Sequence, residues 1–415
     1  MHLVFALALA TLLAIWQTET ASADTADAAA RGLAAATVAD RDAALAELAA
    51  SSGDPLADYA AGSIRFFVAL EKLAGGFYRH GFESPQSFML PLMRLPVPDN
   101  YAPEPLTYEK FRAILTDFRD ELEASSATLA KVPAGAEIAL VVDLATVGID
   151  VNGDGRIGIE ESAAGIIAAL GGGGDASPGD TPSLAFRFDR ADGYWLQGYA
   201  HFLMAQTDFW LAHDFRNAFD GSFHMLFPRA ELPLQALLVP QGPPSDMISA
   251  EWRIADFISL VHYVNWPVDE PDRRRAARTH LMEMIRLSRE NWKAIRAETD
   301  NDREWLPGPQ QPGEHALTGM SVGEAEVQAW HAALQMAEDL LEGRALLPHF
   351  RITGQGIDMK RFFDEPQTFD LVPLITGPGA VPYLAKGRIL TSEQFDAIRR
   401  QFGGAGFMAF ALWFN

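Results

Sequence analysis

Apolar residues recur every three or four positions along most of the chain, which is the spacing of one face of an α-helix. Residues 108–130, 274–298 and 324–342 show this pattern most clearly. In the first segment the apolar face is formed by Phe111, Ile114, Leu115, Phe118 and Leu122. The alanine-rich residues 25–50 follow the same pattern more loosely. The spacing therefore predicts that the chain is mainly helical.

Alternating apolar and polar positions, which are the pattern of a half-buried β-strand, are rare in this chain. Residues 184–188 and 371–375 are the best examples, and both segments are short. We therefore expect a mainly α fold, in which a helical bundle-like body is accompanied by few short strands.

Glycine and proline interrupt the helical pattern. Residues 171–182 read GGGGDASPGDTP, which is the composition of a flexible linker. This linker would separate an N-terminal helical region, residues 24–170, from a C-terminal helical region, residues 183–415. A second interpretation stays open, because helices on both sides of the linker could equally share one core.

The N-terminus has the pattern of an export signal. Residues 3–15 are almost entirely apolar, and Ala21-Ser22-Ala23 matches the small-x-small cleavage pattern. We interpret residues 1–23 as a signal peptide and the chain as an exported protein, periplasmic or extracellular. No other segment is long and apolar enough to span a bilayer, so no integral membrane segment is expected after cleavage.

The amino-acid composition bears on the cellular location and on the kinds of partner that the chain can bind. The chain has no cysteine, which excludes disulfides, thiol nucleophiles and cysteine-ligated zinc. Exported animal proteins usually carry disulfides, so their absence favours a bacterial periplasm. The formal net charge of −22 opposes binding to the phosphates of nucleic acids and favours cations as partners.

Residues 150–161 (DVNGDGRIGIEE) carry oxygen-bearing side chains at alternate positions. Asp150, Asn152 and Asp154 occupy the first, third and fifth places, Gly155 supplies a sharp turn, and Glu161 stands twelfth. Calcium takes six to eight oxygen ligands, and a twelve-residue loop with this spacing can wrap it. The segment resembles the calcium-binding loop of the EF-hand family, and we refer to it as the predicted calcium loop.

The resemblance implies a ligand set and a cofactor, Ca²⁺. The expected ligands are the side chains of Asp150, Asn152 and Asp154, the backbone carbonyl of Arg156 and a bidentate Glu161. Loops of extracellular modules bind calcium at roughly 10⁻⁴–10⁻³ M, which suits a structural or binding role better than cytosolic sensing.

The resemblance also implies flanking helices, an incoming one over residues 138–149 and an outgoing one over residues 160–170. Together they would make a single EF-hand helix-loop-helix, residues 138–170, inserted in the helical body. EF-hands usually occur in pairs, and this chain has no second complete loop. The nearest partial match, residues 300–304, is interpreted as a turn at the end of a helix.

A second candidate lies in residues 192–215. On a helix, Tyr194, Gln197, His201 and Asp208 fall within about 60° of one another. Burying such groups is costly unless they are hydrogen-bonded, so the stripe is either a satisfied core network, which we favour, or a site. In the second case His201 could act as the general base of a hydrolase-like enzyme, and Asp208, two turns away, would reach it only through a water.

Three other features receive structural interpretations. Ser321 in the sequence GMSVG matches a nucleophile elbow, but no strand precedes it, so we expect it to cap the helix that begins at Glu324. His280 is isolated on an amphipathic segment and is predicted to be a packed or surface residue. The apolar residues 402–415 are expected to pack on the core, with docking to a protein partner as the alternative.

Overall fold

The computed structural model describes residues 23–84, 97–169, 184–238, 246–299, 301–311 and 321–402. Most of the expected signal peptide, the expected linker at residues 171–182 and the C-terminal residues 403–415 lie outside this described part. The prediction of a mainly α fold with few short strands is confirmed.

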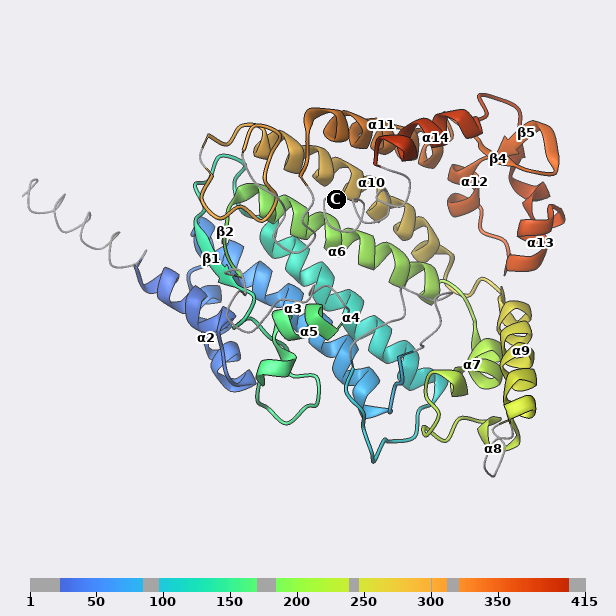
Figure 1. Cartoon of the computed structure of the whole chain (residues 1–415), viewed down its shortest axis with the longest axis horizontal. Helices are drawn as coiled ribbons and strands as arrows, with labels where there is room; N and C mark the ends of the chain where they lie inside the picture. Colours follow the sequence, from blue (N-terminus) through green and yellow to red (C-terminus); the bar gives the residue numbers. More distant parts are fainter. Residues whose placement is uncertain are drawn as a thin grey trace, which may run out of the picture.

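Four long helices form the body of the protein. They are α3 (Pro55–Arg79), α4 (Tyr108–Leu129), α6 (Arg190–Leu211) and α10 (Pro271–Ile295). Helix α3 packs on α4, α4 on α6, and α6 on α10, so the four lie side by side in that order (Figure 1). The helices predicted at residues 108–130 and 274–298 are thus confirmed, although α10 begins three residues earlier than expected.

Local caps set the starting points of these helices. Before α3, Asp54 Oδ1 accepts a hydrogen bond from the backbone N–H of Leu56 at 3.0 Å, and Pro55 suits the first turn. Before α4, the side chain of Thr107 accepts the N–H of Lys110. Asp189 caps α6 in the same way.

Helices α3 and α4 approach each other closely at Gly62. A Cβ atom at this position would lie 2.5 Å from Cγ of Leu129, so the contact requires glycine. Ser125 on α4 donates a hydrogen bond of 2.7 Å to the carbonyl oxygen of Gly62. The next residue, Ser126, points away from α3 and contacts α6.

One apolar core connects the two halves of the chain. It contains Leu33 and Ile64 from the N-terminal region together with Leu196, Trp292 and Trp330 from the C-terminal region. A second cluster, rich in phenylalanine, lies at one end of the body and includes Phe77, Phe82, Phe111, Phe215, Phe219, Phe223 and Phe227. Helices from both sides of the expected linker therefore share one core among the described residues.

Shorter helices surround the body, and none of the described helices is long and apolar enough to cross a membrane. They are α2 (Val38–Ala50), α5 (Ala163–Ala169), α7 (Arg216–Ser222), α8 (Gln235–Leu238), α9 (Asp246–Tyr263), α11 (Glu324–Leu341), α12 (Met359–Asp364), α13 (Leu371–Thr376) and α14 (Ser392–Gln401). The helix predicted over residues 25–50 is interrupted, because residues 23–33 are helical and α2 begins only at Val38.

Within the described residues, the strands form three small antiparallel sheets. The pairs are β1 (Leu140–Asp143) with β2 (Ala185–Phe188), β3 (Asn265–Trp266) with β6 (Phe369–Asp370), and the three-stranded set β4 (Leu347–His349), β5 (Ile352–Ile357) and β7 (Leu384–Ala385). The strand predicted at residues 184–188 is confirmed by β2.

The strand predicted at residues 371–375 is wrong. These residues form helix α13, which follows directly after the two-residue strand β6. Pro373 has no N–H to give to a sheet, and Gly377, with φ of +113°, ends the helix in a conformation that favours glycine.

Candidate functional site

The predicted calcium loop closes on itself through its side-chain oxygens. Asp150 Oδ2 accepts a hydrogen bond from the N–H of Gly155 at 2.9 Å. Asn152 Oδ1 accepts the N–H of Asp154 at 2.8 Å, and Asp154 Oδ1 accepts the N–H of Arg156 at 2.8 Å. These bonds tie the three predicted side-chain ligands to backbone amides of the same turn.

Glu161, the last predicted ligand, is buried and turned back into the loop. Its Oε1 accepts the N–H of Val151 at 2.9 Å, and its Oε2 accepts the N–H of Gly158 at 2.9 Å. Gly153 and Gly155 have φ of +74° and +83°, in the left-handed region where glycine is favoured. The two glycines therefore allow the chain to turn sharply, and the hydrogen bonds of Glu161 connect the end of the loop to its start.

A segment of the N-terminal region pairs with the loop. The N–H of Ile157 donates to the carbonyl oxygen of Ala36 at 3.0 Å, and the N–H of Val38 donates to that of Gly155 at 3.1 Å. These bonds form an antiparallel bridge between Thr37 and Arg156. Residues 36–38 thus fix the middle of the loop through backbone hydrogen bonds.

A buried ion pair supports the first residue of the loop. The backbone N–H of Asp150 donates to Oε2 of Glu71 on α3 at 2.6 Å. The guanidinium of Arg41, which is only 3% exposed, donates two hydrogen bonds of 2.6 Å to the same carboxylate. Helices α2 and α3 are therefore connected to the loop through Glu71.

The incoming helix predicted at residues 138–149 is wrong. Strand β1 and a turn lie there instead, because Leu140 and Val142 are buried in the ladder with β2. On the outgoing side, a single 3₁₀ turn (Ile159–Glu161) precedes α5, which begins at Ala163. The likeness to an EF-hand is accordingly limited to the loop and the helix that follows it.

Three acidic side chains converge at a different place. Carboxylate oxygens of Asp189, Glu298 and Glu304 all lie within 4.8 Å of one another, and among the described residues no other set of three meets that criterion. Burial, followed by the charges of Asp189 and Glu304, raises the pKa of Glu298 to about 9. The carboxylates of the loop are spaced more widely, because Glu161 is held by the loop's own amides.

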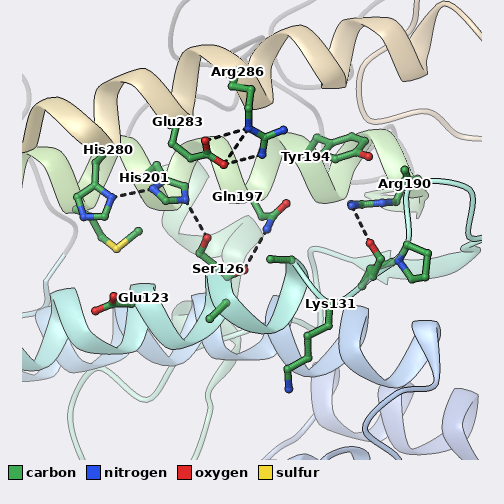
Figure 2. Close-up of a pocket in the computed structure, with 16 residues that line it drawn as sticks. Glu123, Ser126, Lys131, Arg190, Tyr194, Gln197, His201, His280, Glu283 and Arg286 are labelled. Atoms are coloured by element: carbon green, nitrogen blue, oxygen red, sulfur yellow. Dashed lines mark hydrogen bonds and ion pairs between the residues drawn. The ribbon is translucent and has the colours of Figure 1, made fainter. Parts of the chain in front are cut away.

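The polar stripe on α6 joins a chain of hydrogen bonds that crosses three helices. His201 Nε2 lies 3.1 Å from Oγ of Ser126 on α4, and His201 Nδ1 lies 2.8 Å from Nδ1 of His280 on α10. His280 Nε2 in turn lies 3.4 Å from Oδ2 of Asp208. Figure 2 shows the two imidazoles side by side, with Ser126 beneath His201. Asp208 thus reaches His201 through His280, and not through the water expected from the sequence.

Asp208 is an ionised acceptor at the end of this chain. It is 1% exposed, and its Oδ1 lies 2.9 Å from Nη1 of Arg273 and 3.3 Å from Nε of Arg119. Burial alone would raise the pKa of Asp208, but the hydrogen bond to His280 and the two guanidinium groups lower it overall. Burial, followed by the nearby His280, lowers the pKa of His201 to about 4, so this imidazole is neutral at pH 7.

A cleft of about 540 Å³ opens beside His201, between α4, α6 and α10. Arg286 holds the carboxylate of Glu283 on one wall with hydrogen bonds of 2.6 to 3.0 Å. On another wall, Nη2 of Arg190 donates to the carbonyl oxygen of Val132, whereas its Nε and Nη1 are buried and have no hydrogen-bond partner among the described residues. Figure 2 shows Arg190 and Lys131 at the end of the cleft away from His280.

The predictions for two single residues need correction. His280 is packed, as predicted, but it is not isolated, because it connects His201 with Asp208. Ser321 is exposed and does not cap α11, since Glu326 accepts the N–H of Gly323 at the start of that helix. Ser126 was not identified from the sequence, where nothing distinguishes it from the other serines and threonines of its helix.

No family model, curated protein or solved structure matches this chain. The predicted calcium loop and the cleft beside His201 are therefore the two features that bear on function.

Proposed function

We propose that this chain is an exported calcium-binding protein in which the predicted calcium loop is a structural site. The observation that carries the proposal is the arrangement of Asp150, Asn152 and Asp154, whose side-chain oxygens are fixed by amides of their own turn. Oxygen-bearing side chains at alternate positions of one turn are the ligands that a hard divalent cation prefers.

Calcium would exchange some of the loop's internal bonds for metal ligation. Asp150, Asn152 and Asp154 would supply side-chain oxygens, Arg156 its carbonyl oxygen, and Glu161 both carboxylate oxygens. Glu161 would have to release hydrogen bonds from loop amides, including that of Gly158, before it could chelate the ion. That competition favours a weak site, of the kind that millimolar calcium outside the cytosol saturates.

The position of the loop supports a role in stabilising the fold. It contacts residues 36–38 through backbone bonds and Glu71 through the N–H of Asp150. Calcium in the loop would therefore hold the first helices of the chain against α3. The export signal predicted at residues 1–23 and the absence of cysteine support a periplasmic or extracellular setting, in which calcium is plentiful.

The test is thermal unfolding of the mature chain in EDTA and in 5 mM calcium chloride, with isothermal titration calorimetry in parallel. A ligand that binds only the folded state stabilises it by about 2.7 kcal/mol at a hundredfold excess over its Kd. The deciding variant is Glu161→Gln, which removes one charge and the bidentate ligand. Glu160→Gln is the matched control, because Glu160 is the adjacent acid but is exposed.

We expect calcium to raise the midpoint of the wild type and of Glu160→Gln, and to leave that of Glu161→Gln near its EDTA value. Magnesium should have a smaller effect, because its octahedral shell fits a large flexible loop poorly. Absence of calcium binding to the wild type in both experiments would overturn the proposal. An equal response in Glu161→Gln would place the calcium at another site and would overturn it as well.

A further inference from the structure

The hydrogen bonds beside the cleft can run in a direction that makes His201 a base. Asp208 is ionised and accepts only, so Nε2 of His280 donates to it. When Nδ1 of His280 carries no proton, it accepts from Nδ1 of His201, which lies 2.8 Å away. In that arrangement Nε2 of His201 is a bare acceptor opposite the hydroxyl of Ser126, at 3.1 Å.

This assignment matches the requirement for an activated serine. A serine hydroxyl becomes a useful nucleophile when a neutral imidazole accepts its proton and a further group fixes the tautomer of that imidazole. Ser126 and His201 meet the first condition, and His280 with Asp208 meets the second. We propose that the cleft is the active site of an acyl-ester hydrolase, with Ser126 as nucleophile and His201 as general base.

The proposed reaction has two steps. Oγ of Ser126 attacks the carbonyl carbon of the ester while its proton passes to Nε2 of His201, and the alcohol then leaves with that proton. A water next attacks the acyl-serine, again giving a proton to His201, and the carboxylic acid leaves as Ser126 takes the proton back. His280 and Asp208 are positioning residues, because they act only by holding the ring of His201.

The cleft has the size that such a substrate needs. A volume of about 540 Å³ lies within the range of pockets for small organic molecules. Glu283 is paired with Arg286, Glu123 with Arg119, and Lys131 with Asp58. Arg190 adds positive charge at the end of the cleft away from His280.

Tyr194, Gln197 and a set of apolar side chains line the remainder of the cleft. The apolar residues are Ala127, Ala130, Val132, Pro133, Ala134 and Met204. They would accommodate a short acyl group. We therefore infer that the substrate is a small carboxylic ester, and this inference is independent of calcium binding at the loop.

The experiment is covalent labelling of the full chain with diisopropyl fluorophosphate, which phosphorylates activated serines, followed by mass spectrometry of the digested protein. We expect one label per chain, on Ser126. The Ser126→Ala variant should take up no label, and His201→Gln should be labelled about 10³-fold more slowly. Ser125→Ala is the matched control, because Ser125 bonds to the carbonyl of Gly62 and should be labelled like the wild type.

Hydrolysis of p-nitrophenyl acetate, measured on the same variants, should follow the same order. Circular dichroism and the unfolding midpoint identify any variant that fails to fold. The site of labelling in the wild type can be determined without the variants. An unlabelled wild type, or a label on a residue other than Ser126, would overturn the assignment. Ester hydrolysis that persists in a folded Ser126→Ala variant would do the same.

Discussion

Glu71 accepts a hydrogen bond of 2.6 Å from the backbone N–H of Asp150, so a side chain of α3 fixes the first residue of the predicted calcium loop. The same carboxylate receives two hydrogen bonds from Arg41 of α2. Three parts of the chain that are far apart in sequence therefore meet at one buried carboxylate. Through this contact the loop connects α2 with α3, whether or not an ion is bound.

Arg41→Met should destabilise the protein strongly. The substitution keeps most of the apolar stem but leaves the Glu71 carboxylate, which is 16% exposed, without its partner. Breaking a fully buried pair costs about 3–5 kcal/mol, and for this partly exposed carboxylate we expect the lower end of that range in urea unfolding. The control is Arg31→Met, since Arg31 pairs with Glu47 on the exposed surface and its loss should cost about 1 kcal/mol or less. Equal effects of the two substitutions would show that the buried pair does not anchor the loop.

Gly155→Ala should strain the loop without causing a clash. Gly155 has φ of +83°, and a Cβ atom added there would meet no other atom within 4 Å. A left-handed alanine costs about 1–2 kcal/mol, so unfolding free energy and calcium affinity should both fall. Gly135→Ala is the control, because Gly135 is also surrounded by open space but lies outside the left-handed region. A loop that tolerates both substitutions equally would not have the conformation described.

The long helices were predictable because their patterns are local. Helix α4 ends within one residue of its predicted C-terminus, and its buried residues Phe111, Phe118 and Leu122 belong to the predicted apolar face. The sharp turn at Gly155 was likewise predictable, because the residues that form it lie within one short segment. Calcium binding by the loop stays a prediction.

The errors arose where distant segments decide the outcome. Residues 138–149 are apolar enough for a helix, but β2, more than forty residues further along the chain, pairs with them as a strand. The interruption of the predicted helix at residues 25–50 has a similar cause, because Ala36 pairs with Ile157. Neither partner can be identified from the local pattern.

The network beside the cleft was predicted only in part for the same reason. Tyr194, Gln197, His201 and Asp208 share α6, so their common face follows from helical periodicity. Ser126 and His280 come from other helices and join the network only when α4 and α10 pack on α6. A single histidine on an amphipathic helix carries no signal of the partner it will meet.

Glu298→Gln should stabilise the protein at alkaline pH. The pKa of Glu298 is about 9 in the folded chain and near its usual value when unfolded, so the folded state binds this proton more tightly. Its contribution to stability is therefore fully present below about pH 4.5 and is lost progressively as pH rises toward 9. The neutral amide removes this loss, and the unfolding midpoint in EDTA should rise by at least about 2 °C at pH 8.5.

At pH 5 the same Glu298→Gln substitution should change the midpoint much less, because the carboxyl is then protonated in the folded state. Glu290→Gln serves as the control, since Glu290 lies near the end of α10, eight residues before Glu298, and pairs with Lys293 instead of with other acids. A stabilisation by Glu298→Gln that is equal at both pH values would contradict the raised pKa.

Labelling of Ser126 should not change between pH 6 and pH 8. The pKa of His201 is lowered by burial and by His280 to about 4, so the ring is already neutral throughout that range. The labelling rate should fall only as pH approaches 4, where His201 takes up a proton. The same shift makes the folded state less stable as pH falls from about 6.5 toward 4, because the unfolded chain binds the proton first.

His280→Gln should move the acid midpoint of the labelling rate upward, toward pH 6.5. Burial, the larger cause of the lowered pKa of His201, remains in this variant, so the midpoint should move only part of the way. The charged groups that then face His201 are Glu283 and Arg286 of α10 and Glu123 of α4. A purely structural role for His280 would slow labelling at every pH without moving the midpoint. The control is His331→Gln, because His331 lies on α11 away from the cleft and its loss should leave the profile unchanged. A wild-type midpoint near 6.5, or one that His280→Gln does not move, would mean that the two histidines do not act as the proposed pair.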